Sequence, residues 1–213
     1  EASVCGGVPI IRSLKEGLIA NKIQKVFGIF NGTSNYILSS MDNKNKNFMD
    51  VLNDAKKLGY AESNPASDLN GDDVSAKLKI LTSLCFNCFL NNKIHVEGIR
   101  DIDKNDINYA NTLGYKIKLL GFAELINNKI YQRVHPTLIK KSSYVASING
   151  VLNAVIIEGK PVGQNIIQGE GAGPAATTSA LISDISSIMR GNIKFPFSIS
   201  NRERKNLKFQ DIS

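Results

Sequence analysis

Residues 115–139 read YKIKLLGFAELINNKIYQRVHPTLI, and they decide the fold that the sequence predicts. Two strand-like runs, Tyr115–Leu125 and Ile130–Ile139, are rich in the aliphatic and aromatic side chains that favour strands. Asn127 and Asn128 lie between them, and asparagine tolerates the left-handed backbone of a tight hairpin turn. The sequence therefore predicts an antiparallel hairpin at this point.

Strands predominate elsewhere as well. A second hairpin is predicted from Val151–Glu158 and Val162–Gln168 across Gly159-Lys160-Pro161, and Lys22–Phe30 has the alternation of an earlier strand. Consecutive hairpins do not fit a simple alternation of strands and helices, so the sheet should be mixed or antiparallel. The predicted fold class is α+β, a mixed, largely antiparallel sheet with helices covering one face.

Helices are predicted where apolar residues recur about once per helical turn. These segments are residues 8–20, Ser34–Met41, Phe48–Leu58, Asp73–Leu90, Asn105–Leu113 and Ala175–Arg190, with a further strand around Ile94–Ile99. Gly59 and Gly114 stand where two of these helices should end. We expect residues 1–190 to form one domain and residues 191–213 to be a basic linker or C-terminal tail.

Composition restricts the class of protein. The 213 residues, 42% of them hydrophobic, suffice for one core. No run approaches the roughly 20 apolar residues that cross a bilayer, and the start, EASVCGG, has no basic region of a secretory signal. The first residue is not Met, so we expect a piece of a longer protein. Three cysteines suit a reducing cytoplasm, and Cys85 and Cys88 fall on the apolar stripe of a predicted helix.

The net charge of +7 raises the question of nucleic-acid binding. Much of the excess lies between Arg190 and Lys208, where the basic residues outnumber the single acid, Glu203. This segment has neither interleaved aromatic residues nor the pattern of a recognition helix. The sequence therefore does not predict a nucleic-acid partner.

The segment Gly59–Lys77, GYAESNPASDLNGDDVSAK, is the one most suggestive of chemistry. It carries four carboxylates with no basic residue before Lys77, namely Glu62, Asp68, Asp72 and Asp73. Asp73 and Lys77 are four residues apart in a predicted helix, so their side chains should meet. Two interpretations remain open: an ordinary surface ion pair, or a partly desolvated lysine that exchanges a proton with a substrate.

Two glycine-containing turns are further candidates. Gly32 and Thr33 precede a predicted helix, whose N-terminal N–H groups would suit an anion, although Thr33 could serve only as its N-cap. Gly169–Gly173, GEGAG, lies between a predicted strand and a helix, as nucleotide-binding turns do. Pro174 occupies the place of the last glycine of the dinucleotide fingerprint, so a simple backbone turn is the alternative.

Several motifs together resemble homoserine dehydrogenases. Besides GYAESNPASDLNGDDVSAK, the segments EASVCGGVPIIRSLKEGL, GIFNGTSNYIL, INYANTLGYKIKLLGFAE, RVHPTLI and GEGAG occur in the order and at the spacing of that family. The likeness covers most of the chain, with Asn64 standing where many members have Asp. It implies NAD(P)-dependent interconversion of L-homoserine and L-aspartate 4-semialdehyde, in the biosynthesis of threonine, methionine and isoleucine.

The resemblance also implies a role for each matched residue. Lys77 would be the catalytic acid/base, and the substrate would be bound by Gly32, Thr33, Tyr60, Glu62, Asp68 and Asp73. Gly173 would contact the cofactor, NADP or NAD. A monovalent cation, such as sodium, would be held largely through the backbone carbonyls of Glu1, Val4, Gly6 and Val8.

The same resemblance implies partners and location. A dinucleotide-binding domain would precede this chain, which itself shows no strand–GxGxxG–helix unit, so these residues alone should have little activity. A cytoplasmic homodimer built through the sheet is expected. A non-catalytic amino-acid-binding or assembly module that reuses this fold is the alternative, and it would bind homoserine without depending on Lys77.

Overall fold

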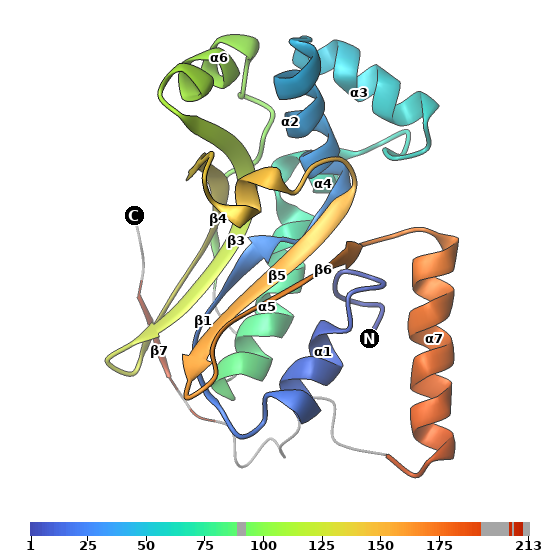
Figure 1. Cartoon of the computed structure of the whole chain (residues 1–213), viewed down its shortest axis with the longest axis vertical. Coiled ribbons are helices and arrows are strands. Elements are labelled where there is room, and N and C mark those ends of the chain that lie inside the picture. Colours follow the sequence, from blue (N-terminus) through green and yellow to red (C-terminus); the bar gives the residue numbers. More distant parts are fainter. Residues whose placement is uncertain (89–92, 193–204, 206, 211–213) are drawn as a thin grey trace.

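The computed structural model describes residues 1–88, 93–192, 205 and 207–210, and one mixed sheet organises them (Figure 1). Its strands are β1 (Lys22–Ile29), β2 (His95–Val96), β3 (Tyr115–Ile126), β4 (Lys129–Lys140), β5 (Leu152–Lys160), β6 (Gly163–Glu170) and β7 (Lys208–Gln210). The order across the sheet is β2-β4-β3-β1-β5-β6, with β7 also paired to β4. The pairs β2–β4 and β4–β7 are parallel and the others antiparallel, which confirms the predicted sheet and the α+β class.

Both predicted hairpins are confirmed. In the β3–β4 hairpin, Ile126 pairs with Lys129, and Asn127 and Asn128 have φ angles of 49° and 59°. Two successive left-handed residues twist the turn in the same sense as the strands, which is why asparagine is favoured there. In the β5–β6 hairpin, Gly159 pairs with Gly163.

Helices supply the remaining layer of the domain. They are α1 (Ile10–Arg12), the π-helical turn η1 (Ser13–Gly17), α2 (Gly32–Lys44), α3 (Phe48–Lys57), α4 (Ala66–Asn70), α5 (Asp72–Phe86), α6 (Lys104–Thr112), the 3-10 turn η2 (Tyr144–Ser147) and α7 (Pro174–Met189). Helix α5 packs against β1, β3 and β4, and its Val74, Leu78 and Leu81 are fully buried in the main core. This packing holds the start of α5 beside the end of β1.

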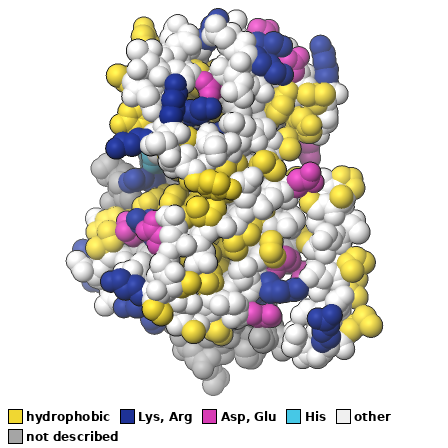
Figure 2. Space-filling model, in the orientation of Figure 1, with side chains coloured by type: hydrophobic (Ala, Val, Ile, Leu, Met, Phe, Trp, Pro, Cys, Tyr) yellow, Lys and Arg dark blue, Asp and Glu magenta, His cyan; other side chains and the backbone are white. Residues whose placement is uncertain are grey.

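The face of the sheet opposite α5 carries a smaller apolar cluster. Leu120 of β3 and Ile156 of β5 pack there with Val145 and Ile148, which belong to η2 and the loop after it. Phe27 of β1 is partly buried at the edge of this cluster, beside Phe122. Hydrophobic side chains also cross the middle of the surface seen in Figure 2.

The structure corrects several predicted boundaries. Helix α2 begins before Ser34 and runs beyond Met41, because Asn31 caps its first turn and the polar residues after Met41 form a last turn before left-handed Asn45. In the acid-rich segment Gly59–Lys77 a helix was predicted only from Asp73, but the segment also contains helix α4 before that residue. The predicted strand at Ile94–Ile99 contracts to His95–Val96.

Helix α5 also ends earlier than predicted. Asn87 adopts a left-handed conformation with φ 53°, and Ser83 Oγ donates to the Cys88 carbonyl, so the chain leaves the helix after Phe86. The rest of the predicted helix, beyond Cys88, lies outside the described residues. Most of the predicted tail 191–213 also lies outside them, so the domain boundary near residue 190 stays a prediction.

Helix α7 stands beside the rest of the domain (Figure 1) and leaves an apolar face uncovered. Five large hydrophobic residues on it are more than half exposed: Leu181, Ile182, Ile185, Ile188 and Met189. Their spacing places them along one side of the helix, and hydrophobic side chains are visible along this segment at the right of Figure 2. Neither α7 nor any other helix in the described ranges has the length and apolar character needed to span a bilayer.

Candidate active site

Four polar side chains form a chain of hydrogen bonds where β1 ends and α5 begins. Lys77 Nζ donates to Asp73 Oδ2 at 2.7 Å and to the Phe30 carbonyl at 2.9 Å. Asn31 Nδ2 donates to the same Asp73 oxygen at 2.8 Å and to Asp68 Oδ1 at 2.7 Å. The Lys77 and Asp73 side chains are only 19% and 28% exposed, so the pair is held in a partly desolvated position rather than on an open surface.

The backbone explains how these residues meet. Asp68 lies on α4, whereas Asp73 and Lys77 lie one turn apart on α5. Gly71 separates the two helices with φ 87°, a conformation that side chains disfavour. A Cβ at Gly71 would also come within 3.0 Å of Val96 on strand β2. The glycine therefore allows a sharp bend that turns Asp68 and Asp73 toward the same asparagine.

Asn31 is the site residue that the sequence reasoning missed. Its side chain is the N-cap of α2, where Oδ1 accepts from Ser34 N at 2.8 Å, and it is only 6% exposed. Thr33 is therefore not the N-cap, contrary to one of the predicted possibilities. The signal was available, since asparagine is among the strongest N-cap residues and precedes the Gly-Thr pair.

The substrate residues predicted around Thr33 are only partly brought together. Thr33 Oγ1 donates to the Tyr60 carbonyl at 2.7 Å, which joins the start of α2 to the loop after α3. The Tyr60 ring packs against Tyr36 with centroids 5.0 Å apart. Glu62 is exposed in the same loop, and within the described ranges no hydrogen bond or ion pair connects it to Lys77 or Asp73.

The start of α2 also presents unpaired backbone donors. The first N–H groups of any α-helix lack partners within the helix, and here Asn31 Oδ1 satisfies the one on Ser34. Gly32 and Thr33 precede Ser34 in this first turn and are partly exposed. This geometry fits an anionic group such as a carboxylate.

The glycine-rich turn and the N-terminal segment lie side by side. Gly7 N donates to the Glu170 carbonyl at 3.0 Å, at the end of β6. Gly173 follows as the exposed N-cap position of α7, with Pro174 as the first helical residue. The turn thus joins a strand to a helix as predicted, and its backbone faces solvent at Gly173.

The predicted cation segment, residues 1–8, is a compact turn. The Glu1 carbonyl accepts from Val4 N at 3.3 Å, and the Val8 carbonyl accepts from Ile10 N at 2.7 Å. A carbonyl oxygen has two lone pairs, so these contacts leave each oxygen one more site. Across the described residues, no group of three or more His, Cys, Asp or Glu side chains could hold a metal.

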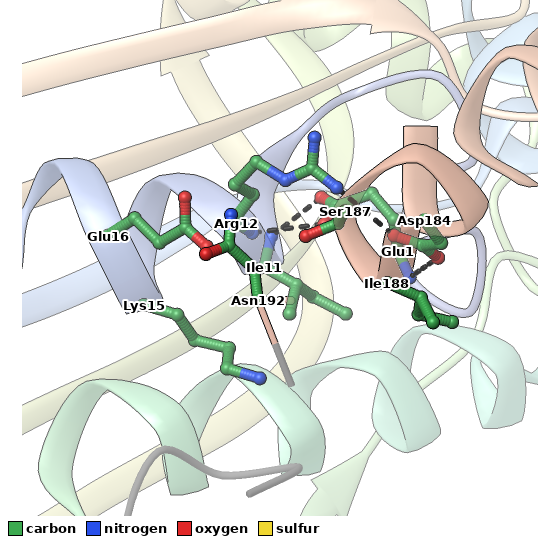
Figure 3. Close-up of a pocket in the computed structure, with 9 residues that line it drawn as sticks. All are labelled: Glu1, Ile11, Arg12, Lys15, Glu16, Asp184, Ser187, Ile188 and Asn192. Atoms are coloured by element: carbon green, nitrogen blue, oxygen red, sulfur yellow. Dashed lines mark hydrogen bonds and ion pairs between the residues drawn. The ribbon is translucent and has the colours of Figure 1, made fainter. Parts of the chain in front are cut away.

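The Glu1 side chain has a separate structural role, shown in Figure 3. Its carboxylate accepts from Ile11 N at 2.9 Å and from Arg12 N at 3.0 Å, and burial raises its pKa above the ordinary value. Arg12 in turn donates to Asp184 Oδ1 on α7 at 3.3 Å. The pocket around these groups is lined by Glu1, Ile11, Arg12, Lys15, Glu16, Asp184, Ser187, Ile188 and Asn192. It does not include Lys77 or its partners.

Comparison with known proteins gives this geometry a family context. The family model described as homoserine dehydrogenase matches residues 9–186. A homoserine dehydrogenase of Neisseria gonorrhoeae is 47% identical over 191 residues, covering 89% of this chain and 44% of the relative. One of Helicobacter pylori is 48% identical over 191 residues, covering 89% and 45%. The chain spans about half the length of the curated relatives it matches.

Solved structures of homoserine dehydrogenases share the fold of this chain. A homoserine dehydrogenase from Thiobacillus denitrificans superposes with a TM-score of 0.93 at 40% identity, covering 99% of this chain and 50% of that one. A hyperthermophilic archaeal homoserine dehydrogenase mutant, solved in complex with NADPH, has a TM-score of 0.73 at 26% identity, with coverage of 90% and 55%.

Proposed function

Because this chain belongs to the homoserine dehydrogenase family, we propose that the full-length protein interconverts L-homoserine and L-aspartate 4-semialdehyde with NADP or NAD. This reaction would serve the synthesis of threonine, methionine and isoleucine. The observation that carries the proposal is the hydrogen-bonded chain of Lys77, Asp73, Asn31 and Asp68 beside the start of α2. It combines a proton-exchanging group with acceptors for an amino-acid ammonium.

Lys77 would exchange the proton with the substrate oxygen. An ammonium group has three N–H donors, and the Phe30 carbonyl and Asp73 Oδ2 accept two of them. The third can donate to the aldehyde oxygen. As the carbonyl carbon gains a hydride, Lys77 gives this proton to the oxygen and becomes a neutral amine, which water reprotonates. In the opposite direction the neutral amine removes the proton from the hydroxyl.

The remaining residues would hold the amino-acid end of the substrate. Asp73 engages Lys77 and Asn31 through Oδ2, and its other oxygen would accept from the substrate ammonium together with Glu62. The backbone N–H groups of Gly32 and Thr33 would bind the carboxylate. The Tyr60 backbone would line the pocket, and Asp68 would orient Asp73 through Asn31.

The nicotinamide cofactor accepts or supplies the hydride when bound. In this chain Gly173 would contact it, and the exposed backbone of that residue at the start of α7 suits such an approach. The relative solved with NADPH supports a cofactor of this kind. Most of the cofactor-binding site would come from a dinucleotide-binding domain in the rest of the full-length protein.

The exposed apolar face of α7 supports the presence of that partner domain in the full-length protein. Soluble domains seldom leave a row of large hydrophobic residues exposed, and such a row marks an interaction surface. Since the chain spans about half the length of its relatives, the other half is the natural occupant. Ile182 and Ile185 would then be buried between the two domains.

The family likeness supports three further parts of the proposal. A homodimer would form through the sheet face opposite α5, where Phe27 and Phe122 are partly exposed. A monovalent cation would bind the backbone carbonyls of Glu1, Val4, Gly6 and Val8. A cytoplasmic location is supported by the free thiols of all three cysteines.

The test is an absorbance assay of the full-length protein. We expect reduction of NADP or NAD, followed at 340 nm, that depends on L-homoserine and gives aspartate 4-semialdehyde. L-2-Aminobutyrate, which has the same amino and carboxyl groups but no hydroxyl, should compete without being oxidised. If homoserine binds but is not oxidised with either cofactor, the protein is a binding module and the proposed reaction is wrong.

A further inference from the structure

Lys118 of β3 is a buried cation that the proposed chemistry does not use. It is only 1% exposed, yet among the residues that the structure describes no carboxylate contacts its ammonium. The three N–H groups of Nζ face four oxygens within hydrogen-bond distance: the Ile148 carbonyl at 2.5 Å, Asn35 Oδ1 at 3.0 Å, Asn149 Oδ1 at 3.1 Å and Ser39 Oγ at 3.2 Å. Burial lowers its pKa to about 8, assisted by the charge of Lys116 and opposed by Asp42.

The four oxygens belong to two separate elements. Asn35 and Ser39 lie on α2, whereas Ile148 and Asn149 lie in the loop between η2 and β5. Asn35 reinforces this junction, because its Nδ2 donates to the Ile148 carbonyl at 3.2 Å and to the Leu152 carbonyl at 3.1 Å. One ammonium therefore ties the loop 148–152 to helix α2.

The loop 148–152 packs against the Gly32–Thr33 turn, which is the proposed site of the substrate carboxylate. The Val151 carbonyl oxygen lies only 2.7 Å from the place that a Cβ on Gly32 would occupy. Gly32 is the first residue of α2, and Thr33 follows it. Any outward movement of the loop would thus remove the surface against which the Gly32 backbone rests.

We propose that Lys118 is a positioning residue for substrate binding, which holds the loop 148–152 against α2 and thereby fixes the Gly32–Thr33 turn that receives the substrate carboxylate. This inference rests on the proposed function. The role requires the three donors of an ammonium, since a shape-matched apolar side chain would leave the oxygens of both elements without their common partner. Lys118 touches none of the reacting groups, so it acts through the turn.

Lys118→Met in the full-length protein removes the donors and keeps a similar shape. We expect the KM for homoserine to rise about tenfold, with kcat and the KM for the cofactor changed less than about twofold, because a displaced turn weakens only the contacts to the amino acid. Asn149→Ala removes one acceptor on the loop and should raise the same KM by a smaller factor. It keeps the test usable if Lys118→Met does not fold.

Lys116→Met is the matched control. Lys116 lies two residues earlier on the same strand and face, and it too contacts α2, through Asp42 Oδ2 at 3.1 Å, but unlike Lys118 its ammonium makes no hydrogen bond to the described residues 148–152. We expect its KM for homoserine to equal that of the wild type. Equal increases in both variants, or an unchanged KM in folded Lys118→Met, would overturn the proposal.

Hydrogen exchange provides a readout that does not depend on the reaction. In Lys118→Met, amides in residues 148–152 and 32–34 should exchange faster together, whereas in Lys116→Met both segments should match the wild type. Wild-type protein that shows no homoserine oxidation would refute the proposed function but leave this comparison intact. Unchanged exchange at residues 32–34 in Lys118→Met would refute the positioning role even in an active enzyme.

Discussion

Asn31→Ala tests the part of the site that links its two carboxylates. The substitution removes the cap on Ser34 N and the two donations to Asp68 and Asp73. Loss of an N-cap costs about 1 kcal/mol. Hydrogen bonds to charged groups contribute about 1.5–3 kcal/mol when buried, but both carboxylates are partly exposed and water can replace the amide, so we assign about 0.5–1 kcal/mol to each.

The sum is about 2–3 kcal/mol, which for a chain of this size lowers the Tm by about 4–12 °C. Asp103→Ala supplies the control, because Asp103 is exposed and caps α6 through Asn105 N and Asp106 N, and none of its hydrogen bonds in the described residues involves a residue of the site. That variant should lose only about 1 kcal/mol. Asn31→Ser keeps a capping oxygen and should therefore be about 1 kcal/mol more stable than Asn31→Ala.

Chemical denaturation of the three variants, made in the full-length protein so that turnover can be measured on the same samples, tests the role of Asn31. We expect Asn31→Ala and Asn31→Ser both to lose most activity, since neither holds Asp73 in place, while Asp103→Ala stays active. If Asn31→Ala is no less stable than Asp103→Ala and turns over normally, then Asn31 is merely a helix cap and the assignment of Asp68 as an indirect partner of Asp73 fails.

Three other outcomes follow from particular contacts. Gly71→Ala, with φ 87° and a Cβ 3.0 Å from Val96, should destabilise by about 2 kcal/mol or more, whereas Gly59→Ala, at φ 76° in open space, should cost only about 1 kcal/mol in urea unfolding. The pKa of Lys118 is near 8 in the folded protein and 10.5 in the unfolded chain, so between these pH values the unfolded chain binds more protons. The free energy of unfolding of the wild type, relative to that of Lys118→Met, should therefore increase by up to about 3 kcal/mol from pH 7 to pH 10.5. A difference that stays constant with pH would contradict this. Ile185→Glu should lower the Tm of the full-length protein by exposing its domain interface but reduce aggregation of residues 1–213 expressed alone, and an unchanged full-length Tm would mean that α7 faces solvent.

Local patterns predicted the fold well, and the predictions failed where distant residues decide the outcome. The asparagine pair at 127–128 is sufficient to indicate a hairpin, since its turn preference is local. Helix α4 was missed because five residues are too few to show a helical period. The parallel partners of β4 likewise cannot be inferred from alternation within short strands.

The same limit applies to the site. The i, i+4 spacing of Asp73 and Lys77 predicted their contact, which is confirmed at 2.7 Å. The donations of Asn31 to two carboxylates 37 and 42 residues away have no local signature. Lys118 alternates with aliphatic neighbours along β3 and therefore looks like a solvent-facing strand residue, although α2 and the loop 148–152 bury it. Their roles become visible only once the chain is folded.

The most direct test of the account is the homoserine-dependent rate at 340 nm for full-length Lys77→Met beside Lys79→Met, which removes a lysine from the same helix two residues away. We predict that Lys77→Met loses at least about a hundredfold in kcat, as expected for a lost acid/base, and remains folded, while Lys79→Met turns over like the wild type. Normal turnover by folded Lys77→Met would contradict the assignment of Lys77 as the proton-exchanging group.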